Sequence, residues 1–438
     1  MEHIAATDPK EMKYIRKRKR QAFRESLCFY ACRIFPVRKN LISVCTFEGK
    51  GGFGCNPKPL VEELHRQNPK LQFVWFVNDM TKEFPDYIRK VPNTLWGRAY
   101  WLSRSKVWID NYRKPYGTKK RKGQYYLNVN HYTIGIKCTG LWRGEGFSPM
   151  AYLVSKNDSD MIDDLVIDSK WCEEVSPKGL VYEGTYQKTG APRCDVLYGD
   201  RSDAKSRFRK KHHIPDDAKV VLFAPTFREG AKDGKRYVFS EIWTIDFQRL
   251  LDNLEKKFGG TWYLCVRVHP QLAPTFQEYK NPEIQDRIID ESQADDMYEI
   301  LAGMDAYISD YSSACFEAGF AHIPVFLYAD DIQKYAKDRG ALMWNIATDP
   351  RERIGNNKVM TPNFDVKLPF SLASDNEELE KDIMEFDKAK YDKVLNEFHE
   401  KVGVVFNGRA SESLADLIIR ICKCYEQDEF GRIKKIHI

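Results

Sequence analysis

The chain has 438 residues, and its 69 lysines and arginines against 63 aspartates and glutamates give a formal net charge of +6. This length indicates two or three domains at ~150 residues each. The hydrophobic share of 42% and the charged share of 30% are ordinary for a globular protein and exclude a low-complexity chain. Because no apolar run approaches the ~20 residues of a membrane-spanning helix, we expect neither an integral membrane protein nor a secretory signal.

The first 39 residues combine a basic stretch with a short apolar one. Eight lysines and arginines lie between Lys10 and Arg24, and residues 27–36 are apolar, rich in aromatic side chains and end in Pro36. This pattern is typical of an interfacial helix on an anionic membrane. A helix packed on the protein body and a nucleic-acid-binding patch are the alternatives. No nucleic-acid-binding signature occurs elsewhere, so we expect no nucleic-acid partner.

From about residue 40, short apolar runs alternate with helical stretches. The expected strands are residues 41–47, 73–77, 107–109, 125–129, 220–224, 262–268, 306–308 and 324–328. Continuous apolar strands separated by helices indicate parallel sheets that are covered on both faces. The sequence therefore predicts an α/β protein whose length allows two such sheets.

A polar run over residues 200–218 marks the expected boundary between the two sheets. The last fifty residues are expected to be helical, with Leu414, Leu417, Ile418 and Ile421 at the spacing of a core-packed helix. The predicted division is a basic segment 1–39, an N-terminal domain 40–205, a C-terminal domain 206–385 and C-terminal helices 386–438 that pack back across the domains.

Polar residues that follow the expected strands are the candidates for chemistry, because doubly wound sheets bind ligands at the carboxyl ends of their strands. Residues 309–313 (Ser-Asp-Tyr-Ser-Ser) follow one strand and precede an expected helix. Hydroxyls and backbone N–H groups at a helix N-terminus bind anions, so this segment predicts a phosphate site. The alternative is that Ser312 or Ser313 is only a helix N-cap.

Two histidines also follow expected strands. His269 precedes a proline in the second half of the chain, where Arg228 offers a planar guanidinium for a phosphate. In the first half, His131 is a candidate general base that would deprotonate a hydroxyl, and Lys137 is a candidate to bind a phosphate. Two histidines and a phosphate site split between two halves favour group transfer from a nucleotide-linked donor. We expect no cofactor and no metal-binding site, since no acidic cluster or His/Cys cluster has metal-site spacing, and a requirement for a divalent metal stays open.

A set of short motifs extends over most of the chain. They are residues 47–57, 128–137, 190–195, 224–228, 267–270, 309–313, 316–317, 328–340 and 407–412, and the Ser-Asp-Tyr-Ser-Ser segment is the most specific of them. From about residue 47 to about residue 417, this combination resembles the CDP-glycerol glycerophosphotransferase family, whose members prime or polymerise teichoic acids and related capsule polymers.

The resemblance implies a GT-B architecture, in which two Rossmann-like domains with parallel sheets face each other across a cleft. It implies that His131 deprotonates the acceptor hydroxyl and that His269 stabilises the transferring or leaving phosphate. The implied donor-binding residues are Thr226, Arg228, Ser309, Asp310, Ser312, Ser313, Glu317 and Arg339, and the implied acceptor or phosphate contacts are Lys137 and Arg193.

The implied activity is transfer of a polyol phosphate from CDP-glycerol to a lipid-linked acceptor hydroxyl, with release of CMP. The implied location is cytoplasmic, on the inner face of the cell membrane, which favours the anionic membrane surface as a partner of the basic segment. A CDP-ribitol donor, a GT-B glycosyltransferase that uses a UDP- or GDP-sugar, and a non-enzymatic scaffold in capsule assembly are the alternatives.

Three positions depart from the family's pattern. Asn130 and Tyr132 flank His131 where the family usually has Trp and Gly, and Cys194 replaces an Asn before Asp195. We therefore expect a reshaped acceptor pocket and a better preserved donor site.

Overall fold

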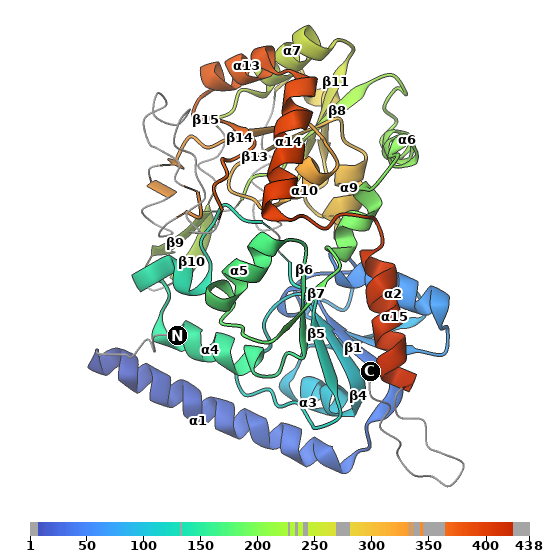
Figure 1. The fold of residues 1–438 in the computed structure, drawn as a ribbon, viewed down its shortest axis with the longest axis vertical. Helices are drawn as coiled ribbons and strands as arrows, with labels where there is room; N and C mark the ends of the chain where they lie inside the picture. The colour runs from blue at the N-terminus through green and yellow to red at the C-terminus, as the bar shows by residue number, and fades with distance from the viewer. Residues whose placement is uncertain are drawn as a thin grey trace. The chain divides into compact units, whose positions relative to one another are not determined.

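The computed structural model describes residues 8–131, 134–226, 228–232, 235–239, 244–268, 281–332, 334–335, 342–344 and 364–423, and of residues 228–239 only the backbone is described. The chain divides into two compact units (Figure 1). The first comprises Met1–His131, Thr139–Asp195 and Val405–Ile438, and the second comprises Tyr132–Cys138 and Val196–Val404. The observed division therefore differs from the predicted one. A short segment after His131 belongs to the second unit, and the C-terminal helices are shared out between the units.

The first unit is built on seven parallel strands in the order β3-β2-β1-β4-β5-β6-β7. These are β1 Arg38–Cys45, β2 Gln72–Val77, β3 Ile88–Pro92, β4 Ser105–Asp110, β5 Tyr125–Asn128, β6 Asp164–Ile167 and β7 Thr185–Lys188. Cys45 of β1 is in register with Asp110 of β4, and Asp110 is in register with Asn128 of β5. The loops that follow these three central strands therefore start side by side at the carboxyl edge of the sheet.

Helices cover both faces of this sheet (Figure 1). They are α1 Pro9–Ala31, α2 Pro57–Gln67, α3 Leu95–Arg104, α4 Pro149–Ser159, α5 Lys170–Gly179 and α15 Ala410–Lys423. Leu60 and Leu64 of α2 pack with Leu414 and Ile418 of α15, and all four side chains are fully buried. Each contributes roughly 1.5–3 kcal/mol by leaving water. The core-packed helix predicted near the C-terminus is thus confirmed.

The second unit has six parallel strands in the order β12-β11-β8-β13-β14-β15. They are β8 Lys219–Phe223, β11 Trp262–Val266, β12 Ile288–Asp290, β13 Ala306–Ser309, β14 Val325–Tyr328 and β15 Ser371–Ala373. Its helices are α6 Ser202–Lys211, α7 Phe247–Phe258, α9 Met297–Ala302, α10 Ala314–Phe320, α13 Asn376–Glu385 and α14 Lys388–Val402. A separate antiparallel pair joins β9 Arg228–Lys232 to β10 Lys235–Phe239.

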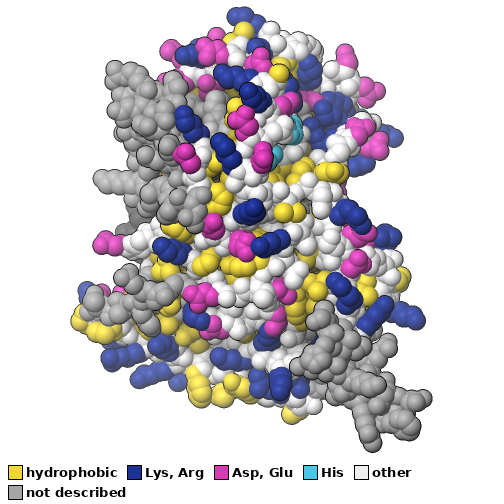
Figure 2. All heavy atoms as spheres, viewed as in Figure 1, with side chains coloured by type: hydrophobic (Ala, Val, Ile, Leu, Met, Phe, Trp, Pro, Cys, Tyr) yellow, Lys and Arg dark blue, Asp and Glu magenta, His cyan; other side chains and the backbone are white. Residues whose placement is uncertain are grey.

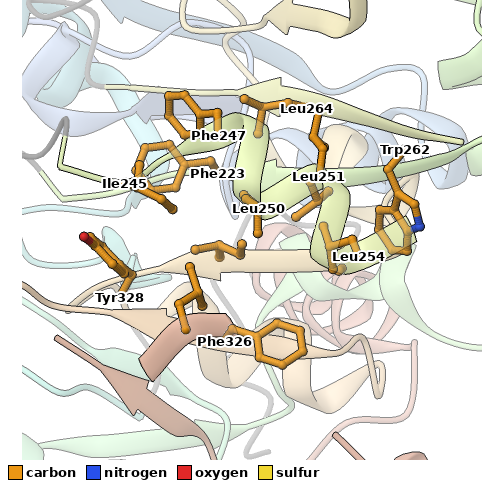
Figure 3. Packing of buried hydrophobic residues seen from close by; sticks show 14 of the residues in the cluster. Phe223, Ile245, Phe247, Leu250, Leu251, Leu254, Trp262, Leu264, Phe326 and Tyr328 are labelled. Carbon is orange, nitrogen blue, oxygen red and sulfur yellow. The ribbon is translucent and has the colours of Figure 1, made fainter. Parts of the chain in front are cut away.

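The core of the second unit lies between its sheet and the helix α7. Leu250, Leu251 and Leu254 of α7 belong to one buried cluster with Phe223 of β8 and Leu264 of β11, and Figure 3 shows Leu254 beside Trp262. The predicted α/β class with two parallel sheets is confirmed, because every expected strand corresponds to β1, β2, β4, β5, β8, β11, β13 or β14.

Candidate active site

His131 lies shortly after β5, at the carboxyl edge of the first sheet. Its Nδ1 is 2.8 Å from the carbonyl oxygen of Asn111. A carbonyl oxygen only accepts hydrogen bonds, so Nδ1 carries the proton of the neutral ring and the ring lone pair lies on Nε2. This is the tautomer that a general base toward a hydroxyl needs.

Asparagines shape the turn that presents His131. Asn130 has a φ of 53°, in the left-handed region that asparagine tolerates better than most residues. Its backbone N–H donates to Asn128 Oδ1 at 2.8 Å, and its own Oδ1 accepts from the His131 N–H at 2.8 Å. The asparagine that stands in place of the family's usual Trp therefore turns the chain at His131.

Asn56 joins three of the motifs in the first unit. It precedes α2, yet its side chain does not cap that helix. Its Nδ2 donates to the carbonyl oxygens of Val129 and Asn130 at 2.8 and 2.9 Å, and its Oδ1 accepts from the Arg193 N–H at 3.0 Å. Arg193 is buried, and its guanidinium lies 3.1 Å from the Cys55 sulfur. Sequence reasoning missed the role of Asn56, since an Asn-Pro pair before a helix looks like a helix start.

The closing motif is connected to the same unit through Asp195. Its two carboxylate oxygens accept from the backbone N–H groups of Ala410 and Ser411, at 3.1 and 2.8 Å, which caps the start of α15. Burial raises the pKa of Asp195. Cys194, which replaces the expected Asn, is itself buried. These contacts explain why residues 190–195 and 407–412 occur as a pair of motifs.

A buried charged network lies beneath the loop that contacts His131. Lys114 Nζ lies 2.5 Å from Asp110 Oδ2, and the two side chains are 3% and 2% exposed. Asp158 of α4 accepts from the Lys114 N–H at 3.0 Å and from the Tyr126 hydroxyl at 3.3 Å. Burial raises the pKa of Asp110, against the effect of Lys114. Polar residues directly after β4 were the available signal for this network, which sequence reasoning did not single out.

Asp158 should make the stability of the protein depend on pH. Burial raises its pKa to about 7 in the folded state, whereas an unfolded Asp titrates near ~3.9. The folded state therefore binds more protons between these values, and its stability falls as the pH rises through them. Between pH 5.5 and 7.5 this group should lower the free energy of unfolding by about 2 kcal/mol. Urea unfolding of Asp158→Asn should lack this fall, and an unchanged pH dependence would contradict the assignment.

In the second unit, residues 309–313 follow β13 and lead into α10. Ser309 is fully buried, and its hydroxyl donates to the Ala224 carbonyl oxygen at 2.8 Å. Asp310 is also buried, and its Oδ1 accepts from the Thr226 N–H at 2.8 Å and from the Thr226 hydroxyl at 2.6 Å. These bonds join the carboxyl ends of β8 and β13 and fix the start of the predicted phosphate-binding segment.

Ser312 and Ser313 are half-buried, unlike the residues before them. Ser313 occupies the N-cap position of α10 without a capping hydrogen bond from its side chain, while Ser312 Oγ accepts from the Ala314 N–H at 3.3 Å. Glu317 is fully buried and accepts from the Tyr298 hydroxyl. Thr226 is half-buried as well, but its hydroxyl donates to Asp310, so of the predicted donor residues whose side chains the structure describes, Ser312 and Ser313 are best placed to contact a ligand.

The structure describes the remaining predicted site residues only in part. Lys137 forms an isolated antiparallel bridge with Leu342 inside the second unit. Arg228 starts β9, and its side chain is not described. His269 and Arg339 lie outside the described residues. The roles of all these residues stay predictions.

Residues 27–420 match the model of the family described as CDP-Glycerol:Poly(glycerophosphate) glycerophosphotransferase. The chain belongs to this family. It is 27% identical over 386 residues to the teichoic acid poly(glycerol phosphate) polymerase of Staphylococcus epidermidis, covering 85% of this chain and 50% of that one. It is 28% identical over 322 residues to the teichoic acid glycerol-phosphate transferase of Staphylococcus aureus, covering 70% and 78%.

The chain spans about half the length of the matched poly(glycerol phosphate) polymerases of Staphylococcus epidermidis and Bacillus subtilis strain 168. Among solved structures, one of the wall teichoic acid polymerase TagF is similar at a TM-score of 0.72 with 23% identity, covering 95% of this chain and 99% of that one. The predicted GT-B architecture, with two Rossmann-like domains and parallel sheets, is therefore confirmed.

Proposed function

We propose that this protein is a glycerophosphotransferase that moves a polyol phosphate from CDP-glycerol to an acceptor hydroxyl and releases CMP. The observation that supports this most directly is the hydrogen bond between His131 Nδ1 and the Asn111 carbonyl oxygen, which leaves the ring lone pair on Nε2. The match to the family model agrees with it. The teichoic acid polymerases and transferases among its relatives agree with it. A relative described as a poly(ribitol-phosphate) polymerase keeps CDP-ribitol as the second candidate donor.

The proposed reaction is an in-line displacement at the β-phosphorus of the donor. The acceptor oxygen forms a bond to this phosphorus as the bond to the bridging oxygen breaks, and CMP leaves with the electron pair of that bond. The acceptor proton passes to Nε2 of His131. Positioning and charge neutralisation supply most of the rate in such transfers. The hydroxyls of Ser312 and Ser313 would donate to the donor phosphates.

The test is CMP release from CDP-glycerol and CDP-ribitol, with UDP-glucose as the control donor and lipid acceptors solubilised in detergent. We expect acceptor-dependent CMP release from CDP-glycerol. Release of UDP from UDP-glucose alone would overturn the proposal in favour of a glycosyltransferase. Absence of any CDP binding in calorimetry would instead favour a non-enzymatic scaffold.

The donor assignment makes a separate prediction. Removing both hydroxyls in Ser312→Ala/Ser313→Ala should raise the KM for the CDP-polyol by at least ~10-fold, because a hydrogen bond to a charged phosphate is worth about 1.5–3 kcal/mol. The KM for the acceptor should change little. Steady-state kinetics with each substrate varied in turn would check this, and an unchanged donor KM would remove Ser312 and Ser313 from the donor site.

We further propose that α1 holds the protein on an anionic membrane, where a lipid-linked acceptor would lie. Ala22, Ser26 and Phe29 form the buried face of α1, which packs against α3. Large apolar side chains remain exposed on α1 and in the turn that follows it, among them Phe23 at 66% and Ile34 at 81%. Figure 2 shows Lys and Arg side chains gathered over α1 together with apolar ones. In the described part of the chain, no helix is long and apolar enough to cross a membrane.

This surface can be tested with vesicles of phosphatidylglycerol and of phosphatidylcholine. Lys17→Gln/Arg20→Gln/Arg24→Gln should weaken binding to the anionic vesicles on the order of 100-fold, since each cation contributes about 1 kcal/mol. The control Arg207→Gln/Lys210→Gln removes two exposed cations of α6 and should leave binding unchanged. Equal binding of the wild type to both vesicles, or tight binding to duplex DNA instead, would overturn the membrane proposal.

A further inference from the structure

The loop after β1 has an unusual backbone beside His131. Phe47, Glu48 and Gly49 follow one another with φ values of 47°, 58° and 82°. For a bulky residue such as Phe, a positive φ is a rare and strained conformation. Such strain persists where the surrounding structure fixes it, and it concentrates at functional sites.

Three asparagines hold this loop, and each is the first residue after a strand of the first sheet. Asn111, after β4, accepts from the Phe47 N–H through its Oδ1 at 2.8 Å. Asn93, after β3, donates from Nδ2 to the Glu48 carbonyl oxygen at 2.6 Å. Asn78, after β2, donates from its backbone N–H to the Gly49 carbonyl oxygen at 2.7 Å. The carboxyl edge of the sheet therefore fixes the strained loop at three successive residues.

The result of this arrangement is an aromatic ring next to the candidate base. The Phe47 ring is 37% exposed and meets the His131 ring edge to face, with the centroids 5.5 Å apart and an interplanar angle of 75°. The Tyr112 ring also lies beside that of His131, with the centroids 5.3 Å apart and an interplanar angle of 42°. Asn111 links both contacts, since its side chain holds Phe47 and its carbonyl oxygen accepts from His131.

A ring that is only partly buried contributes less to stability than a fully buried one, because large aromatic side chains stabilise a protein chiefly by burial. The strained backbone that holds Phe47 costs some of that contribution. Ligand sites, in contrast, combine aromatic surface with a few precisely placed polar groups. Polyols and sugars fit such a site, because their C–H groups pack on an aromatic face while their hydroxyls point to the polar group. The family's usual Trp beside the histidine is Asn130 here, and within the described part of the chain the rings of Phe47 and Tyr112 contact that of His131.

We propose that Phe47 and Tyr112 form an acceptor subsite, in which the carbon face of a polyol or sugar stacks on the Phe47 ring and one of its hydroxyls is aimed at Nε2 of His131. This inference rests on the proposed function. It adds that the rings of Phe47 and Tyr112 form the surface that binds the acceptor. The acceptor is bound in this subsite through its terminal, hydroxyl-bearing unit.

The experiment measures acceptor kinetics with saturating CDP-glycerol and a lipid-anchored synthetic glycerol phosphate oligomer in detergent. Phe47→Ala should raise the acceptor KM at least tenfold with the donor KM within twofold, and Phe47→Trp, which keeps an aromatic face, should recover most of the loss. The control Tyr198→Ala removes an exposed ring of the second unit and should leave both KM values unchanged.

Phe47→Gly separates binding from a structural role. Glycine takes a positive φ without strain, so this variant should melt no lower than the wild type and still show the raised acceptor KM. An acceptor KM unchanged in Phe47→Ala and Phe47→Gly, in an enzyme whose wild type is active, overturns the subsite alone. Absence of CMP release by the wild type overturns the proposed function, and the subsite with it.

Discussion

His131→Ala should abolish transfer, with kcat lowered by about 10³-fold, in line with the loss of a positioned general base. The structure gives the physical reason. Nδ1 bonds to the Asn111 carbonyl, so the lone pair of the neutral ring lies on Nε2 and can take the acceptor proton. Binding of CDP-glycerol should stay within a few-fold of wild type, because the predicted donor residues lie in the second unit. CMP release measures the first quantity, and calorimetry with CDP-glycerol measures the second.

The matched control is His213→Ala, which removes an exposed imidazole that lies at the end of α6 in the second unit. It should leave kcat and donor affinity unchanged. Turnover of His131→Ala near the wild-type rate would reject the role of His131 as a base. A loss of donor binding as large as the loss of kcat would assign the residue to the donor site instead.

The fold was largely predictable from the sequence where strands are buried on both faces. β1, β2, β4 and β8 each contain a run of apolar residues and were expected at nearly their observed places. β3, β6, β7, β12, β15 and the antiparallel pair β9 and β10 were not expected. β7 has the sequence Thr-Tyr-Gln-Lys with no fully buried residue, and it lies at the edge of its sheet. A short polar edge strand is defined by the neighbour to which it bonds, which local sequence does not reveal.

The candidate site was predictable only in part. His131 follows a strand, and this position alone pointed to a ligand-facing residue. The contacts that hold it come from Asn56 and Asn111, and Asn56 bonds to residues between 73 and 137 positions away in the chain. Ser309 and Asp310 were expected at the donor, yet both are buried and bonded to the end of β8. The sequence indicates which segment lies near the site. Which residues of that segment can contact a ligand depends on their burial, and the sequence does not show it.

Lys114→Met should strongly destabilise the protein. Lys114 and Asp110 form an ion pair at 2.5 Å with almost no exposure to solvent. Removing the ammonium leaves the Asp110 carboxyl buried without its partner, and such changes cost about 3–5 kcal/mol of folding free energy. The Lys114 charge opposes the burial that raises the pKa of Asp110, so without it this pKa should rise further and the loss should be largest at alkaline pH. Urea unfolding at pH 6 and pH 8.5 measures both effects.

Two further variants show whether burial is the cause. Lys120→Met breaks the pair with Asp163, whose side chains are 17% and 37% exposed, and it should cost no more than about 1 kcal/mol. Asp110→Asn/Lys114→Met removes both charges and should recover much of the stability that Lys114→Met loses. Equal costs for Lys114→Met and Lys120→Met would contradict the argument.

The same variants connect stability to the candidate active site. The loop between Asp110 and Lys114 contains Asn111, which accepts from Nδ1 of His131 and from the Phe47 N–H. If the buried pair fixes this loop, the folded fraction of Lys114→Met should also have a lower kcat than the wild type. The double variant Asp110→Asn/Lys114→Met should then recover most of the lost stability but less of the lost kcat. A double variant with wild-type kcat would mean that the asparagine and histidine contacts hold the loop without the ion pair.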